Sequence, residues 1–133
     1  MSNRTFRIAA DIPPNDELWV TRRWVSHPAS TGAEQLTVVE ATLKPGQSHS
    51  FHQHPRQEEV VFVLAGTVEQ WVEHEKRLLG IGDAAFIPGG TVHASFNAGD
   101  GDARLLAIFG PCAGEGFETI EVSGEAPWKN LRT

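Results

Sequence analysis

The chain has 133 residues, of which 40% are hydrophobic and 21% charged, and its formal net charge is −6. This size and balance are typical of one globular domain, so we expect a single domain over residues 1–133. The acidic charge disfavours binding to nucleic acid, and no basic run predicts docking on a membrane. Cys112 is the one cysteine and cannot form an intramolecular disulfide. Without an apolar signal segment or a bilayer-spanning run, the sequence predicts a cytoplasmic protein.

Residues 1–33 form an irregular N-terminal extension, in which Leu18 to Val25 (LWVTRRWV) could be a strand. Further along, short apolar runs of strand length lie between glycine and proline residues. These expected strands are Leu36 to Leu43, Glu59 to Leu64, Val68 to Val72, Ala84 to Ile87, His93 to Phe96, Arg104 to Phe109 and the alternating Phe117 to Val122. Glu73 to Arg77 (EHEKR) is interpreted as a hairpin turn. Many short strands at near-regular spacing indicate a β-sandwich or barrel.

A first group of residues with metal-ligand chemistry lies in residues 46–66, with the spacing G-x5-H-x-H-x4-E-x6-G. In a strand, residues i and i+2 point to the same face, so His52 and His54 can converge on one ion. Pro55 ends that strand, and the next strand begins near Glu59, which can return a carboxylate to the same ion. The rival acid is Glu58, but adjacent strand residues face opposite sides, so only one of the two can reach the ion.

A second group lies in residues 82–97, with the spacing G-x5-P-x-G-x2-H-x3-N. Pro88, Gly89 and Gly90 predict a tight turn that sets His93 at the start of the following strand. Asn97 ends this strand beside another turn, where its side chain can bond to the backbone, so we interpret it as structural.

Together the two segments resemble both conserved motifs of the cupin superfamily. The resemblance implies an all-β fold, a double-stranded β-helix or jelly-roll barrel with a metal near one mouth. It also implies that the metal ligands are His52, His54, Glu59 and His93. Cupins commonly pair, so a homodimer is expected, with Leu18 to Val25 as the candidate interface. Three imidazoles and one carboxylate suit one divalent Fe, Mn, Ni, Cu, Co or Zn ion and disfavour Ca or Mg.

Strand parity also predicts the surroundings of the site. His49 lies three residues before His52 and should face outward, as a surface residue. Val61 and Val63 share the parity of Glu59, and Ser95 shares that of His93, so these three should form pocket walls. Two aromatic residues, Trp71 and Phe96, are alternative candidates for lining the barrel.

The first functional hypothesis is a metal-dependent enzyme, an oxidoreductase similar to the cupin dioxygenases of the quercetinase or diketone-cleaving kind. In it Glu59 binds the ion and takes the proton of an acidic hydroxyl or enol of a small organic substrate. The chain contains no tyrosine, which disfavours the cupin sugar epimerases, dimethylsulfoniopropionate lyases and thiol dioxygenases that use one. The alternatives are a non-redox metal-dependent isomerase or lyase, and a non-catalytic cupin that binds a small molecule.

Overall fold

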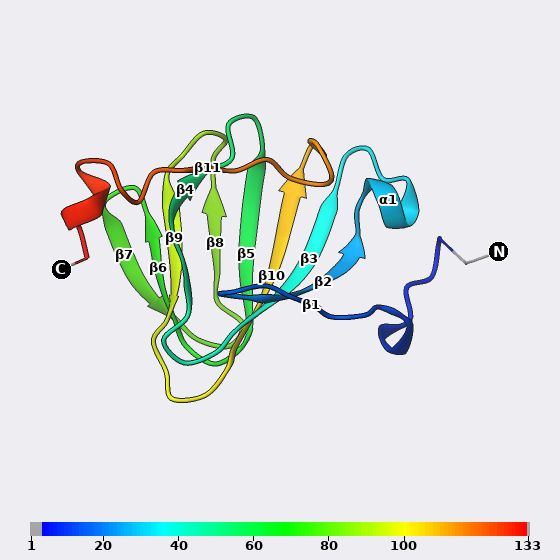
Figure 1. Cartoon of the computed structure of the whole chain (residues 1–133), viewed down its shortest axis with the longest axis horizontal. Helices are drawn as coiled ribbons and strands as arrows, with labels where there is room; N and C mark the ends of the chain where they lie inside the picture. Colours follow the sequence, from blue (N-terminus) through cyan, green and yellow to red (C-terminus); the bar gives the residue numbers. More distant parts are fainter. Residues whose placement is uncertain (1–3, 133) are drawn as a thin grey trace.

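The computed structural model describes residues 4–132, which fold into two antiparallel β-sheets that face each other (Figure 1). Sheet A has the strand order β1-β2-β3-β10-β5-β8, and sheet B the order β11-β4-β9-β6-β7. The strands of sheet A are Asn15–Asp16 (β1), Thr21–Ser26 (β2), Thr37–Leu43 (β3), Ala103–Gly110 (β10), Glu58–Ala65 (β5) and Ala84–Ile87 (β8). Those of sheet B are Ile120–Glu121 (β11), Ser48–Gln53 (β4), His93–Asn97 (β9), Val68–Val72 (β6) and Glu75–Leu79 (β7). This is the jelly-roll barrel that the sequence predicts.

Helical structure is limited to three short segments among the described residues: Ala9–Asp11 (η1), Pro28–Thr31 (α1) and Trp128–Asn130 (η2). Within residues 4–132, no helix is long and apolar enough to cross a membrane.

The hydrophobic core lies between the sheets because successive strand residues alternate between the inner and outer faces. Along β5, Glu59, Val61 and Val63 are buried while Glu58 is exposed. The same alternation runs along β10, which pairs with both β3 and β5 in the middle of sheet A. The central core cluster consists of Val20, Leu43, Val61, Val63, Val68, Ile87, Ala103 and Leu105.

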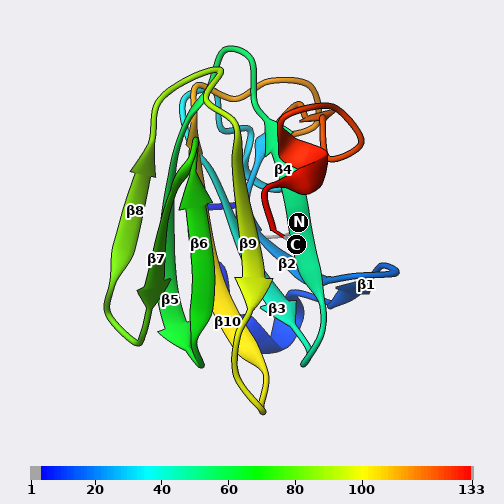
Figure 2. The ribbon, with the colours of Figure 1, turned by 90° about the vertical axis from the view of Figure 1, so that its left-hand side faces the viewer.

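A second apolar cluster covers the outer face of sheet B, where the C-terminal turn η2 lies against the strands (Figure 2). Trp71 belongs to this cluster, and Phe96 and Trp128 pack against it. The alternative that Trp71 and Phe96 line the barrel is therefore wrong. Gln70 and Ser95 are their neighbours on the strands and take the inward positions, where they share a 2.6 Å hydrogen bond.

The expected strands are present, with three differences. Strand β4 ends at Gln53, so His54 lies just after the strand that carries His52 and not on it. Only Glu73 and His74 form the turn that was expected over Glu73 to Arg77, because Glu75–Leu79 is strand β7. This strand lies at a sheet edge and its side chains are largely exposed, so it has no apolar alternation to reveal it. The expected strand Phe117 to Val122 is shorter, with only Ile120–Glu121 paired as β11.

The N-terminal extension adds β1 and β2 to sheet A (Figure 1). Both tryptophans of the Leu18 to Val25 stretch are half-buried: Trp19 packs against the central core and Trp24 against Val39 and Phe109. Leu18 is 96% exposed. The homodimer stays a prediction, and within this stretch the tryptophans are already packed inside the same chain.

Candidate metal centre

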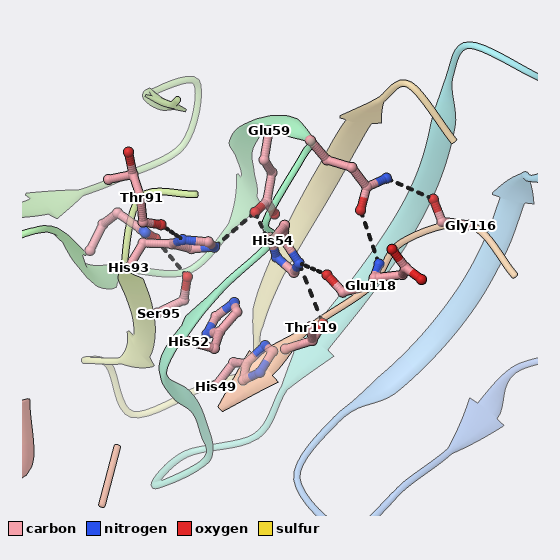
Figure 3. A network of polar contacts seen from close by, with 12 residues as sticks. His49, His52, His54, Glu59, Thr91, His93, Ser95, Gly116, Glu118 and Thr119 are labelled. Atoms are coloured by element: carbon pink, nitrogen blue, oxygen red, sulfur yellow. Dashed lines mark hydrogen bonds and ion pairs between the residues drawn. The ribbon is translucent and has the colours of Figure 1, made fainter. Parts of the chain in front are cut away.

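Three buried histidines converge between the sheets (Figure 3). His52 lies on β4 and His93 begins β9, and the two residues are paired across sheet B. His54 follows β4 in the turn that leads to sheet A. One ring nitrogen from each histidine lies within 4.8 Å of the others. The Pro88 to Gly90 turn places His93 as expected, with the Thr91 N–H bonded to the Pro88 carbonyl and Gly90 at a φ of 74°.

Glu59 reaches the same point from β5 of sheet A. Its Oε1 lies 2.9 Å from His93 Nε2 and 3.2 Å from His54 Nε2. Its side chain is buried, whereas the rival Glu58 is exposed on the opposite face of the strand. The structure therefore brings together all four residues named by the sequence, and it leaves Glu58 outside.

The backbone determines which nitrogen of each histidine faces the centre. In each histidine, Nδ1 lies close to a backbone carbonyl oxygen. The distance is 2.6 Å from His52 to Ser50, 2.8 Å from His54 to Glu118, and 2.9 Å from His93 to Thr91. A carbonyl oxygen can only accept, so each Nδ1 carries the proton and donates it. Each neutral ring then keeps the lone pair of Nε2 for a metal, which is the usual arrangement around metal-binding histidines.

Two buried atoms at this centre support the fit to a metal. Among the described residues, Glu59 Oε1 and His93 Nε2 have no hydrogen-bond partner. Such atoms are costly to bury unless another group satisfies them. Their separation is also suitable: two adjacent ligands that each lie about 2.1 Å from an ion are about 3 Å apart. Three imidazole nitrogens and a carboxylate oxygen thus fit a divalent transition metal.

Burial and neighbouring charged groups together determine the charge state of these groups. Burial, together with the positive charge that His49, His93 and His54 carry when protonated, lowers the pKa of His52 well below its usual value. Burial opposes ionisation of Glu59, but in the metal-free site hydrogen bonds and positive charge from protonated His54 and His93 outweigh burial and lower the pKa of Glu59 to about 2. A neutral His52 and an ionised Glu59 are the forms that bind a metal.

The expectation that His49 is an outward-facing surface residue is wrong. It faces the interior, and its side chain is only 17% exposed. Its ring stacks on that of His52, with centroids 3.4 Å apart. The pairing of β4 with β9 runs from His49–Ser95 to His52–His93, so β4 has one extra residue there. Such a bulge reverses the facing of the residues before it, and the parity rule therefore fails at His49. Its Nε2 lies 2.9 Å from Glu121 Oε2.

A cavity of about 60 Å³ adjoins the four residues. Val61 and Ser95 line it as expected, whereas Val63 lies in the central core and does not. Most of the other walls are apolar, and Arg22 is the only permanently charged cation among the described lining residues. These other walls are Trp19, Val20, Arg22, Val39, Ala41, Leu43, His49, Leu105, Ala107, Phe109 and Phe117.

Gln57 is a positioning residue that motif spacing did not identify. Its side chain is buried, and its amide donates to the carbonyl oxygens of Pro111 (2.7 Å) and Gly116 (3.0 Å). It also accepts from the Glu118 N–H at 2.9 Å. This loop carries the Glu118 carbonyl that orients His54 (Figure 3). No sequence signal identifies these partners, because they lie more than 50 residues away along the chain.

Asn97 is structural, as expected from the second motif. Its side-chain amide donates to the carbonyl oxygens of Leu43 and Gly101, both at 2.9 Å, and its oxygen accepts from the Gly99 N–H at 2.8 Å. It holds the turn after β9 and takes no part in the histidine cluster.

Comparison with known proteins agrees with this fold. The sequence profile of the family described as Cupin domain matches residues 39–109, from β3 to β10. The chain belongs to the cupin family. The matched region contains the three histidines and Glu59, and the cupin fold accounts for their convergence.

The likeness to individual relatives extends over most of the chain. Protein SchB of Streptomyces halstedii is 35% identical over 115 residues, which cover 85% of this cupin and 83% of SchB. Polyketide synthase CurC of Streptomyces cyaneus is 31% identical over 103 residues, covering 77% of this cupin and 67% of CurC. The structure of KdgF from Halomonas sp. superposes with a TM-score of 0.73 at 28% identity, covering 81% of this cupin and 95% of KdgF.

Proposed function

We propose that this cupin is a metal-dependent enzyme that acts on a small 1,3-dicarbonyl compound, with His52, His54, His93 and Glu59 as the ligands of one divalent transition metal. One observation carries the metal assignment. Each histidine donates Nδ1–H to a backbone carbonyl, so three Nε2 lone pairs and a carboxylate remain for the ion. When bound, the ion supplies Lewis-acid polarisation of two carbonyl oxygens and, if redox-active, the electrons for oxygen chemistry.

The size of the cavity limits the range of substrates that fit. Cavities that take drug-sized ligands are about 300–1,000 Å³, whereas this one is about 60 Å³. A three-ring flavonol, the substrate of a quercetinase, is therefore disfavoured relative to a short diketone. The apolar walls favour the carbon skeleton of such a compound, and its two oxygens suit an ion that keeps open positions.

The chain's own residues would orient the metal ligands and accept the substrate's proton. The backbone carbonyls of Ser50, Glu118 and Thr91 hold the three rings in fixed orientations. Among the described residues that line the cavity, Glu59 is the only carboxylate. We therefore assign Glu59 the role of the base that accepts the proton lost when a 1,3-dicarbonyl forms its enolate.

The reaction class proposed first is dioxygenation of the diketone-cleaving kind. One carbon–carbon bond breaks and both atoms of O₂ enter the products, a carboxylic acid and an α-dicarbonyl. The second candidate is a non-redox isomerase or lyase reaction of the same substrate class. It is favoured by the relative named a polyketide synthase, since polyketides are built of repeating β-keto units. A binding cupin without turnover is the remaining alternative.

The first test is the metal content of protein purified without chelator or affinity metal, measured by mass spectrometry beside the His93→Ala variant. We expect one Fe, Ni, Cu, Mn, Co or Zn ion per chain, lost in the variant. Loaded protein is then mixed with acetylacetone in an oxygen electrode while the enol absorbance is followed. One O₂ consumed per diketone supports the dioxygenase, and diketone loss without O₂ supports the non-redox reaction. No metal in either protein would overturn the proposal.

A further inference from the structure

Arg22 is a cation held at the cavity wall that the metal site does not use. It lies on β2 opposite Ala41 of β3, and both residues line the cavity. Its side chain is only 12% exposed. The next residue, Arg23, points to the outer face, where it lies 3.8 Å from Glu40.

The position of the guanidinium is set by aromatic rings. Its central carbon lies 5.0 Å from the ring centroid of Trp19 and 5.4 Å from that of Phe117, and both rings line the same cavity. Contacts of this kind hold a cation in place without using its N–H groups. One amino group, Nη1, pairs with Glu17, whose side chain is more exposed (39%). Arginine has five N–H donors, so this pair leaves others for a ligand.

The charge in the cavity favours an anion. A divalent ion with Glu59 as its one charged ligand has a net charge of +1. Arg22 adds a second positive charge to the same small space, offset in part by its pair with the more exposed Glu17. No carboxylate other than Glu59 is found among the described lining residues. Beside apolar walls, such charges are screened less than in water.

We infer that Arg22 is a specificity-determining residue, which selects substrates that carry a carboxylate in addition to the two oxygens offered to the metal. This inference rests on the proposed function and names its substrate class, an acyclic 1,3-dicarbonyl acid. The metal takes the dicarbonyl end of the molecule and the guanidinium takes the carboxylate. Glu17 competes for the guanidinium and keeps it in place when no ligand is present.

The test uses two probes that differ by this one group, acetylacetone and 2,4-dioxopentanoate. Dissociation constants are measured by calorimetry on metal-loaded protein and compared as a ratio. We expect wild type to prefer 2,4-dioxopentanoate by about 10- to 100-fold, the range of one charged hydrogen bond. Arg22→Gln should bring the ratio close to 1, and Arg22→Lys should keep part of the preference. Arg23→Gln removes the same charge from the outer face and should keep the ratio. Glu17→Gln should increase the preference for 2,4-dioxopentanoate, because the competing carboxylate is removed.

The outcomes separate this inference from the proposed function. Wild type that binds both probes equally would overturn the role of Arg22 and leave the dicarbonyl proposal standing. Equal loss of preference in Arg22→Gln and Arg23→Gln would also overturn it. Wild type that binds neither probe in any metal form would overturn the substrate class and this inference with it. Metal content and thermal unfolding of each variant show whether its fold and metal site are intact.

Discussion

The Nδ1 atom of His54 lies 2.8 Å from the backbone carbonyl oxygen of Glu118, 64 residues further along the chain. The orientation of one candidate metal ligand therefore depends on the loop before β11. Gln57 holds that loop through two carbonyl groups and the Glu118 N–H. Outer hydrogen bonds of this kind affect metal affinity because they fix the ring and its tautomer.

We expect Gln57→Ala to weaken metal binding about 10-fold or more, because the loop loses its anchors and His54 loses its fixed orientation. The affinity is measured by competition with a chelator of known strength. Gln35→Ala, at an exposed position, is the control and should bind metal like wild type. Unchanged affinity in a folded Gln57→Ala protein would show that the loop does not orient His54.

The two adjacent glutamates offer a direct comparison. Glu59→Gln keeps the size of the side chain but removes the charge, and we expect a loss of metal affinity beyond the 10- to 100-fold typical of an outer contact. Glu58→Gln removes the same charge from the exposed face of β5 and should leave affinity and turnover unchanged. Metal content by mass spectrometry is the readout. Equal metal content in the two variants would remove Glu59 from the ligand set.

The metal-free protein should become less stable as the pH falls. Burial lowers the pKa of His52 well below 6.5, so between about pH 7 and pH 5 the unfolded chain binds a proton that the folded chain does not. Falling pH then favours unfolding, by up to about 1.4 kcal/mol per pH unit for one such histidine. Urea unfolding in the presence of EDTA at several pH values measures this slope.

Two variants test the source of this pH dependence. His52→Asn should reduce the slope because the titrating group is gone. His74→Asn replaces an exposed ring that packs on Trp128 and should leave the slope as in wild type. If His52→Asn and wild type have the same slope, His52 is not the group responsible.

Gly116, in the loop that holds His54, is packed too closely to accept a larger side chain without loss of stability. A Cβ added at Gly116 would meet Thr37 Cγ2 and Trp24 Cζ3, each at 3.0 Å. We expect Gly116→Ala to lower the free energy of unfolding by about 1–3 kcal/mol, as overpacking does elsewhere. At Gly101 an added Cβ meets no atom within 4 Å. Gly101→Ala should therefore change stability by less than about 1 kcal/mol. Thermal unfolding compares the two, and equal effects would contradict the packing argument.

Local patterns in the sequence determined most of the strands, and the resemblance to the two cupin motifs named the four residues of the candidate site. A strand alternates its faces every residue, so apolar spacing reveals inward positions, and Pro55 and the Pro88 to Gly90 turn mark where strands end. The choice of Glu59 over Glu58 followed from this alternation together with the motif spacing. Strand β7 was missed because the side chains of an edge strand contact mostly solvent.

Tertiary structure alone decided the surroundings of these residues. The extra residue between His49 and His52 becomes visible only when β4 is paired with β9, and it turns His49 into the cavity. Arg22 and Phe117 reach the same wall from segments far apart in the chain. The sequence by itself determined the ligand types and their facing, because both depend on neighbours within one or two strands. The cavity, its cation and the anchors of the histidine rings depend on which distant strands and loops pack together, so only the folded chain decided them.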